Sequence, residues 1–527
     1  MQVLLLSMPD AFEHMPAVAV RMPNGALASL AANVEPHHRV AVADLILART
    51  AVRSTVERLV RDTAPAVVGL SVMTFQRKTA LQIAALVKQQ SPDTRIVVGG
   101  YDPTLAPDAY AGGTAIDFIV KGEGEHTFRD LLRALEHGSP VDTIPGLSYR
   151  RESSFVHNPP RPVLKLENER LQLPNRRARV LQGYTLLGKQ VDVVETSRGC
   201  TYDCSFCSII EMRGRNFHPF PIDRVLADIA DARANGARAI FLVDDNITLD
   251  VERFETLCRA IEQAGFNDVE YFVQAMTSSI ANHGATLAPL MRRAGFRYVF
   301  LGIENIVEDD LVFLRARAKN ARRERGHTTG NASIEAIEHL HRNGMVVVGG
   351  LIVGNPQDTP EAVRSNLEFA RRYVDWPYIQ HPTPYPRTPM TQDFRDRGLI
   401  VDEDMTHYDG TTAVVRSEKM TSDEIEFMRW RAERWMKLRH FPQAALRNPA
   451  FVARHGLEML GHTFAGWTVR SLFSDEAERA AFRRFKVLRA RERERLSDEL
   501  TMRADDVFAE PPGFGETKKG QSTLQSV

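Results

Sequence analysis

Three of the chain's four cysteines stand within eight consecutive positions, at Cys200, Cys204 and Cys207 of the segment ETSRGCTYDCSFCSI (195–209). Clustered thiolates are typical ligands of zinc or of an iron–sulfur cluster. Structural zinc sites close with four ligands, and no second pair of cysteines follows here. Three thiolates on one loop can instead hold three irons of a [4Fe–4S] cluster and leave the fourth iron open. We therefore expect a reactive iron–sulfur site, with zinc or a fully ligated electron-transfer cluster as the alternatives.

The fourth cysteine and the bulk composition narrow the class of protein. Cys258 lies in the amphipathic pattern RFETLCRAIEQAG (253–265), which predicts a buried small residue in a helix. Four cysteines in 527 residues are too few for a disulfide framework, which indicates a reducing compartment and predicts a cytoplasmic protein. Lys+Arg and Asp+Glu both number 67, so no net charge favours nucleic acid as a partner.

The first residues, MQVLLLSMPD, lack the basic segment and the longer apolar stretch of a signal peptide. No apolar run approaches the roughly 18–20 residues that a membrane span needs. We therefore expect no transmembrane segment.

The elements that would position the cysteines begin with alternating strands and helices over residues 1–145. Five β-rich runs, separated by helical patterns such as KTALQIAALVKQQ (78–90), predict an α/β fold with a doubly wound parallel sheet. The runs are VLLLS (3–7), VAVA (40–43), VVGLS (67–71), IVV (96–98) and DFIV (117–120). Ligands of such sheets bind beyond the carboxyl ends of the strands, and small residues gather there in this sequence.

A second alternation fills residues 191–395, after a stretch rich in Pro, Arg and Asn (146–190) that predicts a linker. Six strands separated by helices predict a partial (β/α)6 barrel with its chemistry at the carboxyl ends of the strands, where the cysteines follow the first strand. The strands are expected at 191–195, 238–243, 270–274, 297–303, 345–353 and 377–381. Residues 396–510 predict a helical C-terminal domain, and residues 511–527 have the composition of a disordered tail.

In this barrel context the cysteine spacing CxxxCxFC resembles the radical S-adenosylmethionine (radical SAM) superfamily. The resemblance implies that Cys200, Cys204 and Cys207 are catalytic and ligate a [4Fe–4S] cluster. It also implies that the open iron binds S-adenosyl-L-methionine (SAM), and that an electron from the cluster cleaves SAM to a 5′-deoxyadenosyl radical. Phe206, directly before the third cysteine, matches the residue that lies near adenine.

Two further segments are similar to parts of that superfamily. GGLIVGNPQDT (349–359) resembles the fifth-strand GxIxG motif, which implies that Gly350, Ile352 and Gly354 help to hold adenine. Glu304 in FLGIEN ends the fourth strand, where relatives often place a polar residue on the ribose or the methionine. For Glu304 a salt bridge at the barrel rim is the alternative.

The N-terminal segment resembles the cobalamin-binding domains that are fused to one branch of the superfamily. GLSVMTFQ, RIVVGGYDPT and DFIVKGEGEHTF match their third, fourth and fifth strand endings. The resemblance implies a corrin over this edge and a groove for its nucleotide tail, lined by small residues and main-chain N–H groups. The residues expected there are Ser71, Thr74, Gly99, Gly100, Gly122 and Gly124. A phosphate- or flavin-binding edge is the alternative.

Cobalamin enzymes often carry a DxHxxG motif whose histidine ligates cobalt from below, and this chain lacks it, as the methylase branch commonly does. Resemblance to that class B methyltransferase branch implies a cobalamin-dependent C-methyltransferase acting on an unactivated carbon through a 5′-deoxyadenosyl radical and methylcobalamin. The alternative is a non-methylating cyclase or rearrangement enzyme of the magnesium-protoporphyrin ester cyclase type. The resemblance also implies an external electron donor such as flavodoxin or ferredoxin.

The small-molecule substrate is not encoded in any motif. Tyr378, His381 and Tyr385 in PYIQHPTPYPRTP (377–389) are candidates to shape its site, and Arg387 is a candidate to pair with a substrate anion or to lie at the surface. The run RARAKNARRERG (315–326) predicts a solvated loop, with phosphate binding as the alternative. RWRAERWMKLRH predicts an ordinary packed helix, with a membrane surface and a lipid substrate as the alternative.

Overall fold

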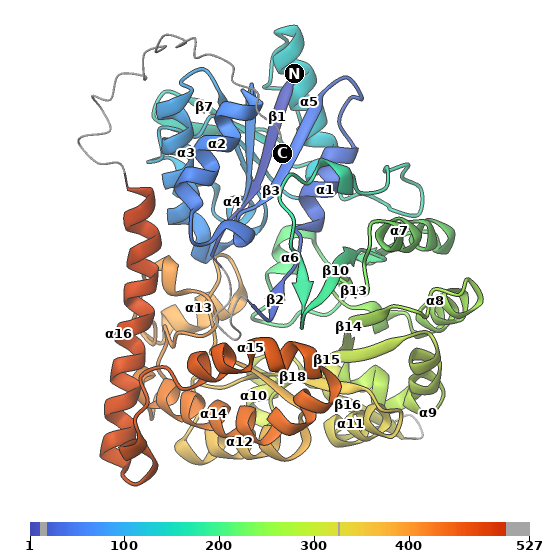
Figure 1. The fold of residues 1–527 in the computed structure, drawn as a ribbon, viewed down its shortest axis with the longest axis vertical. Helices are drawn as coiled ribbons and strands as arrows, with labels where there is room; N and C mark the ends of the chain where they lie inside the picture. Colours follow the sequence, from blue (N-terminus) through green and yellow to red (C-terminus); the bar gives the residue numbers. More distant parts are fainter. Residues whose placement is uncertain (11–17, 325–326, 502–527) are drawn as a thin grey trace, which may run out of the picture.

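The computed structural model describes residues 1–10, 18–324 and 327–501, which form two α/β units and a set of C-terminal helices (Figure 1). The first unit is built on a seven-stranded sheet with the order β3-β1-β4-β5-β6-β7-β8. Its first five strands run parallel, which confirms the doubly wound sheet. The unit contains β1 (Gln2–Ser7), α1 (Gly25–Ala32), β3 (Arg39–Asp44), α2 (Val52–Thr63), β4 (Val67–Ser71), α3 (Arg77–Gln90), β5 (Arg95–Gly99), α4 (Tyr101–Leu105), β6 (Phe118–Val120), α5 (Gly124–His137), β7 (Leu147–Arg151) and β8 (Ser154–His157).

Helices on both faces explain why the central strands are unbroken apolar runs. In β1, Leu4 and Leu6 belong to one apolar cluster, whereas Val3 and Leu5 belong to another. Successive side chains of a strand point to opposite faces, so each face of this sheet must be covered. The sheet is therefore buried between two layers, and only its ends are open for a ligand.

The second unit is built on an eight-stranded sheet with the order β19-β18-β15-β14-β13-β10-β9-β2. Six of its strands run parallel and confirm the partial barrel. They are β10 (Lys189–Val194), β13 (Ala239–Leu242), β14 (Glu270–Met276), β15 (Phe296–Glu304), β18 (Val346–Ile352) and β19 (Trp376–Gln380). The antiparallel pair β9 (Thr185–Leu186) and β2 (Val20–Arg21) extends one edge, so a segment from near the chain start completes the second sheet.

Helices alternate with the parallel strands of the barrel, and short elements follow the strand ends. The helices are α6 (Ser208–Arg213), α7 (Ile222–Ala234), α8 (Val251–Gln263), α9 (Thr277–Arg293), α10 (Glu308–Phe313), α11 (Ser333–Arg342), α12 (Pro360–Tyr373) and α13 (Pro389–Asp396). The short strands are β11 (Ser197–Arg198), β12 (His218–Pro219), β16 (Ala321–Glu324) and β17 (His327–Asn331).

The segment expected as a linker, residues 146–190, is largely part of the two units. Its β7–β8 hairpin pairs antiparallel with β6 and continues the first sheet beyond residue 145. Within this segment Arg176 and Arg179 are buried and bind Asp192 at 2.9 and 2.8 Å. Composition alone does not reveal such pairing, because the aspartate partner stands in β10, outside the segment.

The C-terminal region is helical as expected: α14 (Ser422–Arg447), α15 (Pro449–Thr463) and α16 (Asp475–Leu500). The Arg-rich α16 runs along the molecule and reaches the first unit, beside α2 and α3 (Figure 1). There Leu496 and Leu500 are buried in that unit's core, and Gln82 donates to the Ser497 carbonyl at 3.1 Å. Residues 502–527, with the expected disordered tail, lie outside the described residues. Among the described helices, none is both long and apolar enough to cross a membrane.

Candidate active site

The cysteine loop leaves the carboxyl end of β10 and leads into α6. The loop turns at Gly199, whose φ is 90°, and an added Cβ would lie only 2.4 Å from the main-chain oxygen of Asn216. On the far side, the Ser205 amide donates to the Leu314 carbonyl at 3.0 Å. The sequence before and within the cysteine motif thus sets the path of the loop through main-chain contacts.

Three consecutive polar residues at the end of β13 support this loop. Asp244 accepts a hydrogen bond from the Thr196 amide at 2.7 Å, and Asp245 accepts one at 2.8 Å from the amide just before Cys200. The amide nitrogen of Asn246 lies 3.9 Å from the Cys200 sulfur. Burial raises the pKa of Asp244 to about 6. These residues were not predicted from the sequence, although a polar run at the end of the second barrel strand was the available signal.

The three thiols are sheltered and lie in one cavity. Burial raises the pKa of Cys204 to about 11 and that of Cys207 to about 12, while the Lys319 ammonium opposes this rise in both. Burial thus favours the neutral thiol at Cys204 and Cys207, and a bound metal would favour the thiolate, because a coordinating thiol is deprotonated by its metal. Cys258, fully buried in α8, lines neither of the two cavities described below. Three thiols without a fourth fit a cluster that keeps one iron open.

This cavity, of about 870 Å³, lies between the barrel mouth and the edge of the first sheet. Its barrel wall contains all three cysteines and the predicted Phe206, Glu304, Gly350 and Ile352. The facing wall comes from the first unit and includes Met8, Asp44, Ser71, Met73, Phe75 and Tyr101. The structure thus brings the predicted Ser71 of the first unit to the same space as the predicted residues of the barrel.

The two glycines of the GxIxG motif have different surroundings, because only the first of them lines the large cavity. Gly350 lines the cavity, and a Cβ there would lie 2.7 Å from the ring of Phe300. Gly354 does not line the cavity; its φ is 105°, and its amide donates to the Asp358 carboxylate at 2.7 Å. Gly354 therefore shapes the loop after β18 rather than bordering the cavity itself.

Glu304 and Lys319 form an ion pair inside the cavity, with Oε1 and Nζ 2.5 Å apart. Glu304 has a φ of 60°, an uncommon backbone conformation for a residue with a side chain. Burial lowers the pKa of Lys319, but the Glu304 carboxylate and the Cys204 sulfur raise it by more. The salt bridge that was expected as the alternative for Glu304 is therefore present. Because it lines the same cavity as the cysteines, a contact of Glu304 with the ribose or the methionine also stays a prediction. Lys319 itself was not predicted: the basic run 315–326 was expected to be solvated, yet this member points inward.

The glycine edge of the first sheet borders a second cavity, of about 380 Å³, at the boundary between the units. Ser71, Gly99, Gly100, Gly122 and Gly124 all line it, and Ser71 also lines the larger cavity. Thr74 lines neither cavity and is buried at 3% exposure. In the described part of the chain no histidine borders either cavity, so no described imidazole is placed to ligate a cobalt ion there.

Gly99 and Gly100 differ in what they would collide with. Gly100 has a φ of 105°, and a Cβ on it would lie 2.9 Å from the Val72 carbonyl oxygen. The protein's own backbone therefore demands glycine there. At Gly99 the nearest atom, the Val120 carbonyl oxygen, would be 3.5 Å from a Cβ, an ordinary contact. The fold leaves room for a Cβ at Gly99, and a longer side chain there would enter the second cavity.

The KGEGE segment also joins the two units. Arg198, two residues before Cys200, donates to the Glu125 carboxylate at 2.7 Å and to Glu195 at 2.9 Å. Burial alone would raise the pKa of Glu125, but the Arg198 guanidinium lowers it to about 2. The glycines of this segment were predicted from the sequence, whereas the role of its glutamates was not. Their partner, Arg198, lies in the second unit, so no local sequence pattern predicts the pairing.

Candidates near the end of the sixth barrel strand have different surroundings. Tyr378 lines the large cavity, whereas His381 is buried, with Nδ1 3.2 Å from the Val353 carbonyl oxygen. Tyr385 packs against the same apolar cluster as Phe206. Arg387 is exposed, as expected for a surface residue.

Comparison with known families accounts for both walls of the cavity. The radical SAM superfamily profile matches residues 194–370, and the B12-binding domain profile matches residues 17–132. The chain therefore carries a radical SAM domain and a B12-binding domain. The [4Fe–4S] cluster, SAM and cobalamin are therefore its cofactors, as the sequence predicted, and the residues present fit all three.

Relatives of this radical SAM enzyme carry several names. It is 27% identical to an uncharacterized methyltransferase of Pyrococcus horikoshii, over 81% of this chain and 90% of that protein. It is 26% identical to the anaerobic magnesium-protoporphyrin IX monomethyl ester cyclase of Synechocystis over 61% of this chain. It is also 26% identical to the hopanoid C-3 methylase of Methylococcus capsulatus over 58% of this chain. The matches span 64% and 56% of those last two proteins.

Solved structures share the fold of the enzyme. The cobalamin-dependent S-adenosylmethionine radical enzyme OxsB superposes with a TM-score of 0.64 at 17% identity, covering 95% of this chain and 78% of that one. The radical S-adenosylmethionine methyltransferase TsrM from Kitasatospora setae gives a TM-score of 0.60 at 20% identity and covers 75% of each chain. These likenesses confirm the predicted combination of a Rossmann-like sheet and a partial barrel.

Proposed function

We propose that this enzyme is a C-methyltransferase that acts on an unactivated carbon of a small molecule. The observation that carries the proposal is the 870 Å³ cavity, because one space borders both the three cysteines and the edge of the B12-binding sheet. When bound, the cluster with SAM supplies a carbon-centred radical, and cobalamin supplies a methyl donor. A substrate in this cavity would lie between the two.

The chain's own residues would bind the cofactors from opposite sides. We assign Cys200, Cys204 and Cys207 to the cluster, with SAM beside Phe206, Gly350 and Ile352. Gly354 would act indirectly on the adenine side, by shaping the loop after β18 through its hydrogen bond to Asp358. Glu304, already fixed by Lys319, presents a carboxylate that can accept a hydrogen bond from the ribose or the methionine amino group. Ser71 and the glycines Gly99, Gly100, Gly122 and Gly124 would border the cobalamin, with Thr74 supporting them from behind.

The cavity walls also suit radical chemistry because much of their lining is apolar. Met8, Met73 and Phe75 of the first unit face Phe206 and Phe300 of the barrel across the same space. A dry, shaped site protects a reactive intermediate from side reactions and holds the reacting atoms close together. The chain thus contributes position and shelter, while the cofactors contribute reactivity.

A non-methylating cyclase or rearrangement enzyme is the second candidate, because the Synechocystis cyclase is among the relatives. Methyltransferase names are also frequent among them, including the Pyrococcus protein and the hopanoid C-3 methylase. These names also make a lipid one candidate for the small-molecule substrate. We further propose a cytoplasmic location, because four cysteines in 527 residues indicate a reducing compartment. We also propose a flavodoxin- or ferredoxin-like electron donor, because the cluster needs an external electron.

The test uses metabolite extracts from cells that lack the gene. Each extract is incubated with reductant and with SAM labelled with deuterium on its methyl group, in the presence of the reconstituted enzyme. The products are then compared with the metabolites of the extract before incubation. A methyltransferase yields a product heavier than its precursor by one labelled methyl in place of hydrogen. The Cys204→Ala variant serves as the matched control and should yield no such product. A new product formed without label would favour the cyclase or rearrangement instead.

A further inference from the structure

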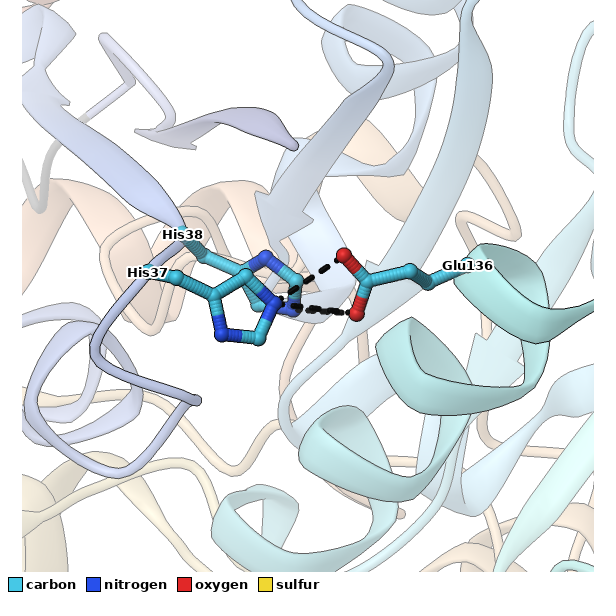
Figure 2. Close-up of side chains that lie close together, drawn as sticks. All are labelled: His37, His38 and Glu136. Carbon is cyan, nitrogen blue, oxygen red and sulfur yellow. Dashed lines mark hydrogen bonds and ion pairs between the residues drawn. The ribbon is translucent and has the colours of Figure 1, made fainter.

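A group of metal-binding side chains lies at the end of the first sheet opposite to the glycine edge. His37 and His38 stand just before β3 begins, and Glu136 lies in the last turn of α5. Figure 2 shows the two imidazole rings and the carboxylate turned toward one another. None of the three residues borders either of the cofactor cavities, so the proposed function does not use them.

The spacing of the donor atoms suits a single ion. His37 Nε2 lies 3.0 Å from both carboxylate oxygens of Glu136, and His38 Nε2 lies 3.9 Å from Oε2. One ligand atom from each residue can be chosen so that all three lie within 4.8 Å of one another. A tetrahedral zinc ion with bonds of about 2.0–2.1 Å holds its ligands roughly 3.3 Å apart. The observed distances lie on either side of that value, so small side-chain rotations would complete the site.

His38 supplies an independent reason to expect a ligand. Its side chain is 0% exposed, and its Nε2 has no hydrogen-bond partner in the described part of the chain. Its other ring nitrogen, Nδ1, lies 3.1 Å from the Met1 nitrogen, which orients the ring so that Nε2 faces Glu136. A buried polar atom without a partner is rare and needs a reason. A metal ion between Nε2 and the carboxylate would satisfy it.

We propose that His37, His38 and Glu136 bind one divalent transition-metal ion of the zinc type. Two imidazoles and a carboxylate are borderline donors that suit zinc and its neighbours, whereas calcium and magnesium prefer oxygen alone. His37 is 58% exposed at its side chain, so a fourth position opens to water.

The ion would join two parts of the B12-binding domain that are 99 residues apart in sequence. α5 begins at Gly124 on the glycine edge and ends beside Glu136, so the ion would hold the far end of this helix against the loop before β3. Its effect would be to stabilise the domain, since a ligand that binds only the folded state raises its stability. The site needs no contact with cobalamin or SAM.

Cobalt(II) is the probe, because its visible absorption reports tetrahedral coordination where zinc is silent. The untagged enzyme, with its iron–sulfur cluster reconstituted so that the cysteines are occupied, is titrated with Co²⁺ and its melting temperature is followed. We expect one additional Co²⁺ per chain, a tetrahedral absorption band and a rise in melting temperature. Competing Zn²⁺ should displace the Co²⁺ and remove the band while the melting temperature stays raised.

Two variants decide the assignment. Glu136→Gln keeps the size of a surface side chain that is 26% exposed, and His38→Ala removes the buried donor. Each should weaken Co²⁺ binding roughly tenfold or more. His157→Ala, which removes a surface histidine paired with Asp108 at 3.0 Å, is the matched control and should bind like the wild type. Absence of Co²⁺ binding in the wild type, or equal binding in wild type and Glu136→Gln, overturns the proposal.

Discussion

The barrel wall of the central cavity and the glycine edge of the first sheet work by different means. The barrel wall contributes atoms that bind: three sulfurs, a carboxylate and an ammonium group from Cys200, Cys204, Cys207, Glu304 and Lys319. The sheet wall, which is the glycine edge that borders the second cavity, contributes mainly space at the carboxyl ends of the strands. A residue that binds can be recognised from its type and spacing. A residue that acts by lacking a side chain can be interpreted only when its neighbours are known.

Gly99 and Gly100 show what this difference teaches. They are adjacent and identical, and the sequence assigned them one role on the cobalamin edge. In the structure Gly100 is required by the Val72 main chain, whereas Gly99 leaves an ordinary contact distance to Val120. Only Gly99 is therefore free to report on the ligand, because a substitution at Gly100 disturbs the fold first.

The strongest test of the barrel wall is Cys204→Ala. We expect this variant to lose both the cluster and SAM cleavage, because only three thiolates are available to hold the cluster and the variant removes one of them. Iron content and 5′-deoxyadenosine formation measure the outcome. Cys258→Ala is the control; it should retain the iron and cost about 1 kcal/mol of stability as a small buried truncation. Full SAM cleavage by Cys204→Ala would contradict the assignment of the loop.

Gly99→Leu tests the sheet wall. The added side chain should fill the groove and remove cobalamin, and with it methyl transfer, while SAM cleavage at the distant cysteines persists. Corrin absorbance and mass spectrometry of both products would separate the two walls. Gly112→Leu is a suitable control, because a Cβ on this exposed glycine would meet no atom within 4 Å. Normal cobalamin binding by Gly99→Leu would show that the corrin or its tail lies elsewhere.

Arg198→Ala tests the salt bridges that connect the first α/β unit to the cysteine loop of the barrel. It leaves the carboxylates of Glu125 and Glu195 without their cation, and breaking a buried pair in this way typically costs about 3–5 kcal/mol. Denaturant unfolding of Arg198→Ala, Glu125→Ala and the double variant measures the coupling. A sum of single effects equal to the double effect would show that Arg198 and Glu125 act independently. Arg233→Ala, which removes an exposed pair with Asp268, should cost less than about 1 kcal/mol.

The smallest expected effect concerns Asp310 in α10, which follows barrel strand β15. Burial, and next the nearby Asp358 carboxylate, raise the pKa of Asp310 from 3.8 to about 8. The folded state therefore holds this proton more tightly than the unfolded state, and stability should fall as pH rises between about 4 and 8.

Asp310→Asn mimics the protonated form and should remove part of that fall. The gain over wild type at pH 8 should be on the order of 1–2 kcal/mol and should vanish near pH 4. Thermal unfolding across this pH range measures it. The exposed Asp309→Asn is the neighbouring control, and equal pH profiles for all three proteins would contradict the raised pKa of Asp310.

Much of this protein follows from local sequence. The strands of both sheets carry apolar runs with helical patterns between them, and burial on both faces leaves such runs little alternative. The cysteine triad fixes its own chemistry because thiolate ligands are few and their spacing is short. Hence the fold class, the two cofactor domains and the iron–sulfur loop could all be predicted from the order of the residues.

Tertiary structure alone decided which charges meet. Arg198 joins Glu125 across 73 positions, and Lys319 turns inward to Glu304 from a run that resembled a solvated loop. The Arg-rich α16 attaches to the first unit, and His38 meets Glu136 far from any motif. Side-chain type states what a residue can bind, but a partner distant in sequence is chosen by the packing of the whole chain. Buried ion pairs and space left by glycine are properties of that packing.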